Sequence, residues 1–129
     1  MTRAVDRDSP HLPRPAQIEA YGKGGFRFAG MSHRGSLLCL PDGIWPWPVA
    51  SPQELSATDI ALVFASTPPV EHCLIGTGRD PWALPRDLAA RFAEHGIAVE
   101  TMTTGAAVRT YNILLGERRR VAALLIAVD

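Results

Sequence analysis

The sequence has little lysine, no net charge and no long apolar run. These absences exclude two classes of protein. A single lysine, Lys23, accompanies twelve arginines, and the formal net charge is zero. This balance excludes the basic footprint of a nucleic-acid-binding domain. No stretch approaches the roughly 18–20 consecutive apolar residues that a membrane-spanning helix needs. We therefore expect no nucleic-acid partner and no transmembrane segment.

Patterns for metal binding and covalent catalysis are also missing. The chain has 2 cysteines and 4 histidines, with no CxxC or HxxxH spacing among them, so we expect neither a metal nor a cofactor. It has no G-x-S-x-G motif, and neither cysteine has a base beside it in the sequence. We assign no catalytic residue, and an enzymatic role is disfavoured. Cys39 and Cys73 lie in apolar runs, which favours buried free thiols in a reducing compartment and leaves a disulfide between neighbouring strands open.

Proline is absent after Pro85, although the chain contains 11 prolines. Residues 1–16 are polar, carry three prolines and lack the apolar core of a secretory signal. We predict that they form a flexible arm, that residues 17–129 form a single α/β domain, and that the protein is cytoplasmic.

The first half of the domain has the pattern of short strands joined by tight turns. Phe26 and Phe28 alternate with Arg27, the period-2 pattern of a half-buried strand. The pattern predicts strands at 18–21, 26–28 and 36–40, a turn over 30–35, an edge strand or extended connection over 44–48, and a short helix from near Pro52 or Thr58 to Phe64. The prolines at 46 and 48 exclude 44–48 from the centre of a sheet.

The second half alternates strands with helices. Pro85 fits the first position of a helix, and Gly96 fits its end. The expected elements are strands at 70–75, 97–100 and 121–128, a helix from Pro85 to Gly96, and a helix from Thr103 or Thr104 to Leu115. The last strand is apolar enough to be central and covered on both faces. The fold class is α/β, with three layers, a mixed central sheet with helices packed on it, and an additional N-terminal β-hairpin layer.

One candidate cleft lies where strand ends meet a helix start. Gly76-Thr77-Gly78 follows a strand, which resembles part of a dinucleotide fingerprint, but Pro81 occupies the third glycine position and delays the helix. A cleft for a small anion fits better, because helix N-termini and arginines attract negative charge. Its candidate ligand-binding residues are Gly76, Thr77, Gly78, Arg79, Thr104, Gly105 and Arg109. Capped helix starts also occur in α/β proteins that bind no ligand, so a purely structural role stays open.

Two further features have a structural and a binding interpretation. The three tryptophans, Trp45, Trp47 and Trp82, lie beside prolines, and they either anchor loops in the core or form a docking surface. Arg118-Arg119-Arg120 forms either a solvated turn or a weak contact for an acidic partner.

Several segments together resemble a known family. The resemblance covers Ile18 to Val128, and its segments are 21–30, 35–41, 75–78, 96–100, 104–107, 110–112, 117–119 and 122–126. In order and spacing they are similar to the archaeal and bacterial proteins of unknown function whose family includes mitochondrial complex I assembly factor three. Mitochondrial members have Pro-Asn where this chain has Gly105-Ala106, which weakens any polar side-chain role there.

The resemblance implies a three-layer α/β domain with a non-enzymatic role in respiratory complex I biogenesis. It implies protein partners among respiratory complex subunits or assembly factors, and it leaves peripheral membrane association open. The alternative is a small-anion-binding protein, or an enzyme of unknown type, that uses the cleft at Gly76–Gly78 and Thr103–Arg109.

Overall fold

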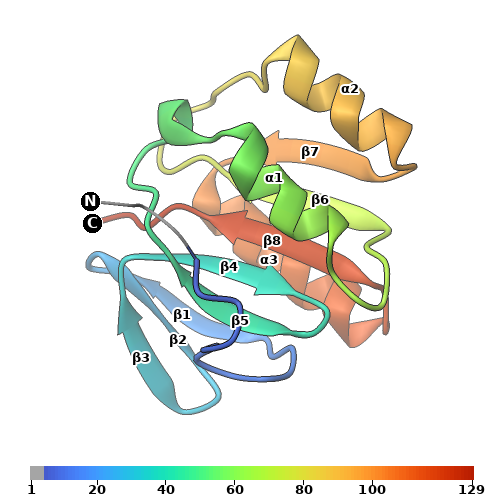
Figure 1. Ribbon diagram of the computed structural model, residues 1–129. Helices are drawn as coiled ribbons and strands as arrows, with labels where there is room; N and C mark the ends of the chain where they lie inside the picture. Colours follow the sequence, from blue (N-terminus) through green and yellow to red (C-terminus); the bar gives the residue numbers. More distant parts are fainter. Residues whose placement is uncertain (1–4) are drawn as a thin grey trace.

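The computed structural model describes residues 5–129 as two β-sheets and three α-helices (Figure 1). The smaller sheet is antiparallel, in the order β1 (Ile18–Gly22), β2 (Gly25–Phe28), β3 (Met31–Arg34). The larger sheet contains β4 (Ser36–Leu40), β5 (Gly43–Trp47), β6 (His72–Gly76), β7 (Ala98–Met102) and β8 (Val121–Leu125). The helices are α1 (Ala57–Phe64), α2 (Arg86–Glu94) and α3 (Thr104–Gly116), and a 3₁₀ turn spans Pro52–Glu54.

The larger sheet is mixed, with the strand order β5-β4-β8-β6-β7. The central strand β8 runs parallel to β6 and antiparallel to β4. β5 lies at one edge and contains Pro46, which pairs with Leu37. The expected edge strand is therefore confirmed, because only an edge tolerates a residue without an N–H donor.

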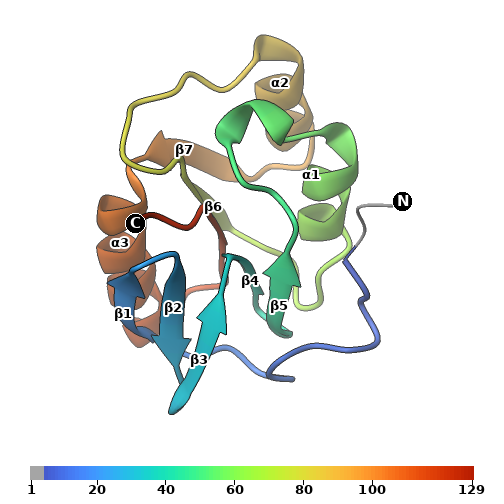
Figure 2. The same ribbon diagram turned by 90° about the vertical axis from the view of Figure 1, so that its left-hand side faces the viewer.

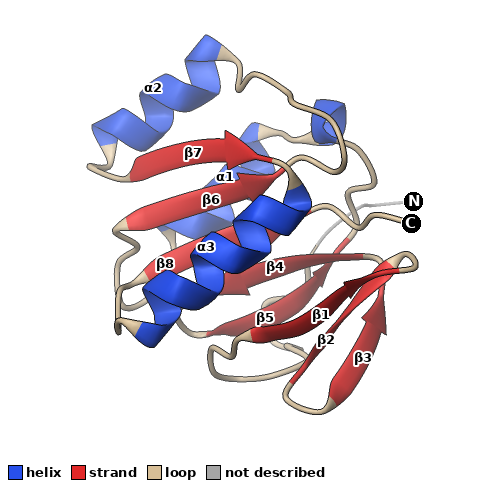
Figure 3. Ribbon diagram, turned by 180° about the vertical axis from the view of Figure 1, so that it is seen from behind, coloured by secondary structure: helices blue, strands red, loops and turns tan. Residues whose placement is uncertain are grey.

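Three layers follow from the alternation of apolar side chains along β8. Ala122 and Leu124 belong to the core on the α1 and α2 side, whereas Ala123 and Leu125 belong to the core on the α3 side. α1 and α2 cover one face, and α3 together with the small sheet covers the other (Figures 2 and 3). The predicted fold class, including the additional N-terminal β layer, is confirmed.

The small sheet contributes its inner face to the core. Ile18, Phe26 and Phe28 are almost fully buried against the α3 side of the larger sheet. The turn predicted over 30–35 is wrong, because Met31–Arg34 is strand β3, paired with β2. Turns do lie at its two ends, where Gly30 and Gly35 have φ angles of 73° and 103°.

Element starts differ slightly from prediction. Pro85 caps α2 rather than opening it, and Thr103 is the N-cap of α3. Of the two starts expected near residues 52 and 58, the first is the separate 3₁₀ turn and the second is close to the start of α1.

Trp45 and Trp47 are core residues, and the Trp47 indole N–H donates to Asp59 Oδ1 at 3.0 Å.

The N-terminal segment lies against β5 and pairs with it at one point. Residues 1–4 of the predicted arm lie outside the described residues. The Arg7 guanidinium lies 4.4 Å from the centre of the Trp45 ring and 2.9 Å from Asp42 Oδ2, and Leu12 forms an isolated β-bridge with Ile44. The flexibility predicted for the arm can be measured for residues 5–16 by hydrogen exchange of their backbone amides.

Candidate functional site

The candidate cleft opens where four separate segments converge. It has a volume of about 670 Å³. The segments are the end of β1, the loop after β6, the start of α3 and the chain after β8. The lining residues are Tyr21, Gly22, Gly78, Arg79, Thr103, Gly105, Ala106, Arg109, Val128 and Asp129.

Four of the seven predicted residues line this cleft, namely Gly78, Arg79, Gly105 and Arg109. The structure brings them together because β6 and β7 are parallel and end at the same edge of the sheet. Both arginines are exposed, and Arg79 Nη2 donates to the main-chain oxygen of Asp129.

The other three predicted residues are held inside the fold. Thr104 is fully buried, and its hydroxyl accepts the Gly78 N–H at 2.9 Å and donates to the Ile126 carbonyl at 2.7 Å. The Thr77 hydroxyl lies 2.8 Å from the Asp80 carbonyl, to which it donates. A Cβ atom at Gly76 would lie 3.0 Å from the Thr104 Cα. Gly76 and Thr104 therefore position the cleft rather than face it, and Thr77 lines an adjoining hollow of about 360 Å³.

Tyr21 is the main lining residue that sequence reasoning missed. Its phenol lies against Gly105, where any Cβ atom would overlap the tyrosine hydroxyl. Tyr21 is 43% exposed, and it precedes Gly105 by more than eighty positions in the chain. No local pattern around either residue signals this contact.

Electrostatics at the start of α3 favour an anion. The N-cap Thr103 makes no side-chain capping hydrogen bond, and Gly105 and Ala106 of the first turn line the cleft. The N-terminal end of a helix carries a partial positive charge, and Arg79 and Arg109 add two full charges nearby.

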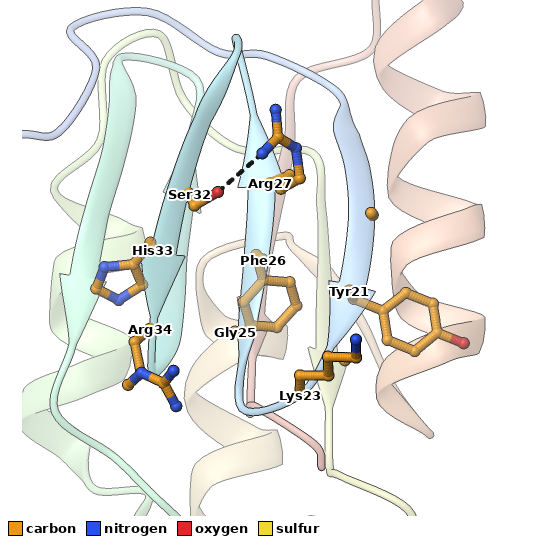
Figure 4. Close-up of a pocket in the computed structure, with 10 residues that line it drawn as sticks. Tyr21, Lys23, Gly25, Phe26, Arg27, Ser32, His33 and Arg34 are labelled. Atoms are coloured by element: carbon orange, nitrogen blue, oxygen red, sulfur yellow. Dashed lines mark hydrogen bonds between the residues drawn. The ribbon is translucent and has the colours of Figure 1, made fainter.

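A second cavity, of about 550 Å³, lies over the small sheet (Figure 4). Tyr21 and Gly22 line this cavity as well as the cleft. Lys23, Arg27 and Arg34 border it, and Arg27 donates to the Ser32 hydroxyl at 3.1 Å. Sequence reasoning missed these residues too, because they approach one another only when the three strands pair.

The titratable groups offer little for covalent chemistry. Burial raises the pKa of the Cys39 thiol to about 12 and also raises that of Cys73, so neither is a thiolate at neutral pH. The two thiols are free and belong to the cores on opposite faces of the sheet, which contradicts a disulfide between them. Within residues 5–129, no cluster of three or more histidine, cysteine, aspartate or glutamate side chains is arranged to hold a metal.

The fold and the cleft define a class of protein: an α/β domain whose mixed sheet and small antiparallel sheet share one helix, with a basic cleft at the start of that helix. The chain belongs to the family "Protein of unknown function (DUF498/DUF598)", whose model matches residues 18–126.

Relatives and solved structures extend this assignment. An uncharacterized protein of Rhodobacter capsulatus is 38% identical over 84% of this chain and 82% of its own length. The crystal structure of an outer membrane protein from Bartonella henselae is 50% identical, with a TM-score of 0.87, over 92% of this chain and 100% of that one. The zebrafish NADH dehydrogenase (ubiquinone) 1 alpha subcomplex assembly factor 3 is 33% identical over 84% of this chain and 63% of its own.

The vertebrate relatives are longer proteins. This chain spans between 59% and 65% of the length of the vertebrate assembly factors that it matches. None of the helices formed by residues 5–129 combines the length and the apolar character that a bilayer crossing requires.

Proposed function

We propose that the protein is a non-enzymatic interaction factor that assists assembly of a respiratory NADH dehydrogenase. The observation that carries this proposal is its similarity, over most of the family domain, to assembly factors of that enzyme. The family model matches residues 18–126, a range that includes the small sheet and α3.

The side chains of the site also favour binding over chemistry. The lining of the cleft includes glycines, two arginines, one exposed tyrosine and Asp129, and arginine and tyrosine are enriched in protein interfaces. The partners in this proposal are subunits or other assembly factors of the complex. The proposal puts the protein in the cytoplasm, at the surface of the membrane in which the complex is built.

Affinity purification combined with a deletion strain tests this function. We expect NADH dehydrogenase subunits to co-purify with the tagged protein, and we expect the deletion to lower NADH:quinone oxidoreductase activity in isolated membranes. Re-expression of the wild-type chain restores the activity. Normal membrane activity in the deletion strain, with no subunit recovered, would overturn the proposal.

The second candidate function is binding of a small anion in the cleft. It is favoured by Arg79 and Arg109 beside the start of α3, where the N-cap Thr103 makes no side-chain capping hydrogen bond. A thermal-shift screen with phosphate, carboxylates and nucleotides tests it, since a ligand at a hundredfold excess over its Kd stabilises the folded state by about 2.7 kcal/mol. Arg109→Ala should abolish the shift, whereas Arg86→Ala on α2 should keep it. No shift with any of these anions rejects this candidate.

A further inference from the structure

The cleft and the cavity over the small sheet meet at Tyr21 and Gly22, which line both. We propose that the two together form one groove, termed the basic groove, that holds an extended acidic segment of a protein partner. This inference rests on the proposed function, because it names the chemistry by which the interaction factor recognises its partner.

Five cationic side chains surround the basic groove. All five are exposed, and they come from the small sheet, the loop after β6 and α3: Lys23, Arg27, Arg34, Arg79 and Arg109. Among residues 5–129, the ion pairs are those of Arg7 with Asp42 and of Arg119 and Arg120 with Glu71. None of these ion pairs involves a cation of the groove. Arg79 donates to the main-chain oxygen of Asp129, the acidic residue that lines the cleft. The charges of the other four cations are available to an acidic ligand.

The basic groove has the shape of an extended site. Its two cavities have volumes of about 550 and 670 Å³, more than a single inorganic anion fills. Small residues line it, including Ala20, Gly25 and Gly105, so a peptide backbone approaches closely. Tyr21 stands where the cavities meet and offers an exposed ring for an apolar side chain of the same segment.

The two halves of the basic groove are fixed to each other. The N–H of Gly24, in the β1–β2 turn, donates to the Val128 carbonyl at 2.7 Å, and the Tyr21 phenol packs on Gly105 of α3. A site that is already formed loses little freedom on binding, which improves affinity.

An acidic peptide fits this surface better than other polyanions do. A bilayer is flat, whereas these cations surround two hollows. A long nucleic acid extends beyond the groove and meets the rest of a molecule whose net charge is zero, so most of its phosphates gain nothing. Two acidic residues lie near the groove. Glu19 accepts the Gly30 N–H at 3.1 Å. Asp129, which lines the cleft, accepts from Arg79 through its main-chain oxygen.

A titration monitored by NMR tests the proposal. The probe is a synthetic decapeptide of glutamate, alanine and one central leucine, added to the ¹⁵N-labelled full chain at low salt. We expect amide shifts at Tyr21, Gly25, Gly105 and Ala106, and weaker binding as added salt screens the charges. Lys23→Glu and Arg109→Glu should each weaken binding at least about tenfold, which corresponds to roughly 1.4 kcal/mol. Arg86→Glu on α2 is the matched control and should bind as the wild type does.

Three results would overturn the basic groove. These are an absence of shifts at the groove, equal affinity for the Arg109→Glu and wild-type chains, and tighter binding to phosphatidylglycerol vesicles or to oligothymidylate than to the peptide. Expressing Lys23→Glu and Arg109→Glu in the deletion strain separates the two proposals. Full restoration by both variants contradicts the groove and leaves the assembly role intact, whereas an absence of any deletion phenotype, with peptide binding preserved, contradicts only the assembly role.

Discussion

Thr104 stands in the first turn of α3, and its hydroxyl joins segments that are far apart in the chain. It accepts the Gly78 N–H from the loop after β6 and donates to the Ile126 carbonyl beyond β8. The Thr104 N–H also donates to the Gly78 carbonyl at 2.9 Å. This one side chain therefore fixes how the start of α3 sits against two of the segments that line the cleft.

Replacing Thr104 with valine should destabilise the fold with little change in shape. The substitution keeps the volume but leaves the Gly78 N–H and the Ile126 carbonyl without their partner in a buried site. We expect a loss of about 2–4 kcal/mol in the free energy of unfolding, measured by urea denaturation. The matched control is Thr110→Val, at a partly exposed position of the same helix, for which we expect a change within about 0.5 kcal/mol. Equal stabilities for the two variants would contradict this role for Thr104.

At the scale of elements, a pair of histidines joins the N-terminal segment to β3. His33 Nε2 lies 3.1 Å from the Ser36 carbonyl, which only accepts, so this nitrogen carries the proton. His33 Nδ1 then accepts from His11 Nε2 at 2.9 Å. Burial, followed by the neighbouring His11, lowers the pKa of His33 below its ordinary value of 6.5.

The lowered pKa predicts a stability that declines in mild acid. Well above pH 6.5, His33 is neutral in both the folded and the unfolded chain, and its contribution to stability is complete. As the pH falls below this value, the unfolded chain takes up a proton first, so the free energy of unfolding decreases until the folded pKa is reached. Urea denaturation at a series of pH values should show this decline, and His33→Gln should reduce it. His95→Gln, at an exposed position on the far side of the molecule, should leave it unchanged, and an unaltered profile for His33→Gln would refute the assignment.

The elements that sequence reasoning predicted are those with local signals. The strand–helix alternation after residue 70 follows from apolar periodicity, from Pro85 and from Gly96. Strand β3 lacks such a signal, because its half-buried side chains are Met31 and His33, and the glycines that flank it are typical of turns. Pairing with β2 overrides the local preference.

The part of the candidate site that could be predicted is again the part that has a local signal in the sequence. The convergence of the loop after β6 with the start of α3 follows from parallel strand order. Sequence reasoning also placed Thr77 and Thr104 among the candidate ligand-binding residues, but their hydroxyls bond to main-chain groups of the fold. Tyr21 and Asp129 reach the cleft only through tertiary contacts.

At the scale of the whole molecule, the zero net charge conceals an uneven distribution. Summed over the whole chain the charges balance, and this balance excluded the basic footprint of a nucleic-acid-binding domain. In the structure, other arginines are paired with Asp42 and Glu71, while the cations of the basic groove have no such partner. Charge balance over a chain therefore does not exclude a local cationic surface.

Thiol labelling should report the opening of the entire domain. Cys39 and Cys73 are fully buried on opposite faces of the sheet, and the raised pKa of each thiol further suppresses the reactive thiolate. We expect both to be labelled by a maleimide at one common rate that follows global unfolding, measured by mass spectrometry in increasing urea. Thr104→Val should accelerate both sites equally. Rapid labelling of one cysteine in the native protein would show local opening instead.

The central position of β8 has a consequence for how the protein is made. β4 and β5 pair as a hairpin, and β6 and β7 are brought together across α2, but β8 alone connects these two halves of the larger sheet. β8 follows the other strands in the chain. The ribosome therefore translates nearly the whole domain before the central strand is available. Until then the emerging chain carries two incomplete half-sheets with open edges, which are prone to aggregation. The domain is thus expected to close in a single late step, once β8 has emerged, and to depend until then on the chaperones that protect nascent chains.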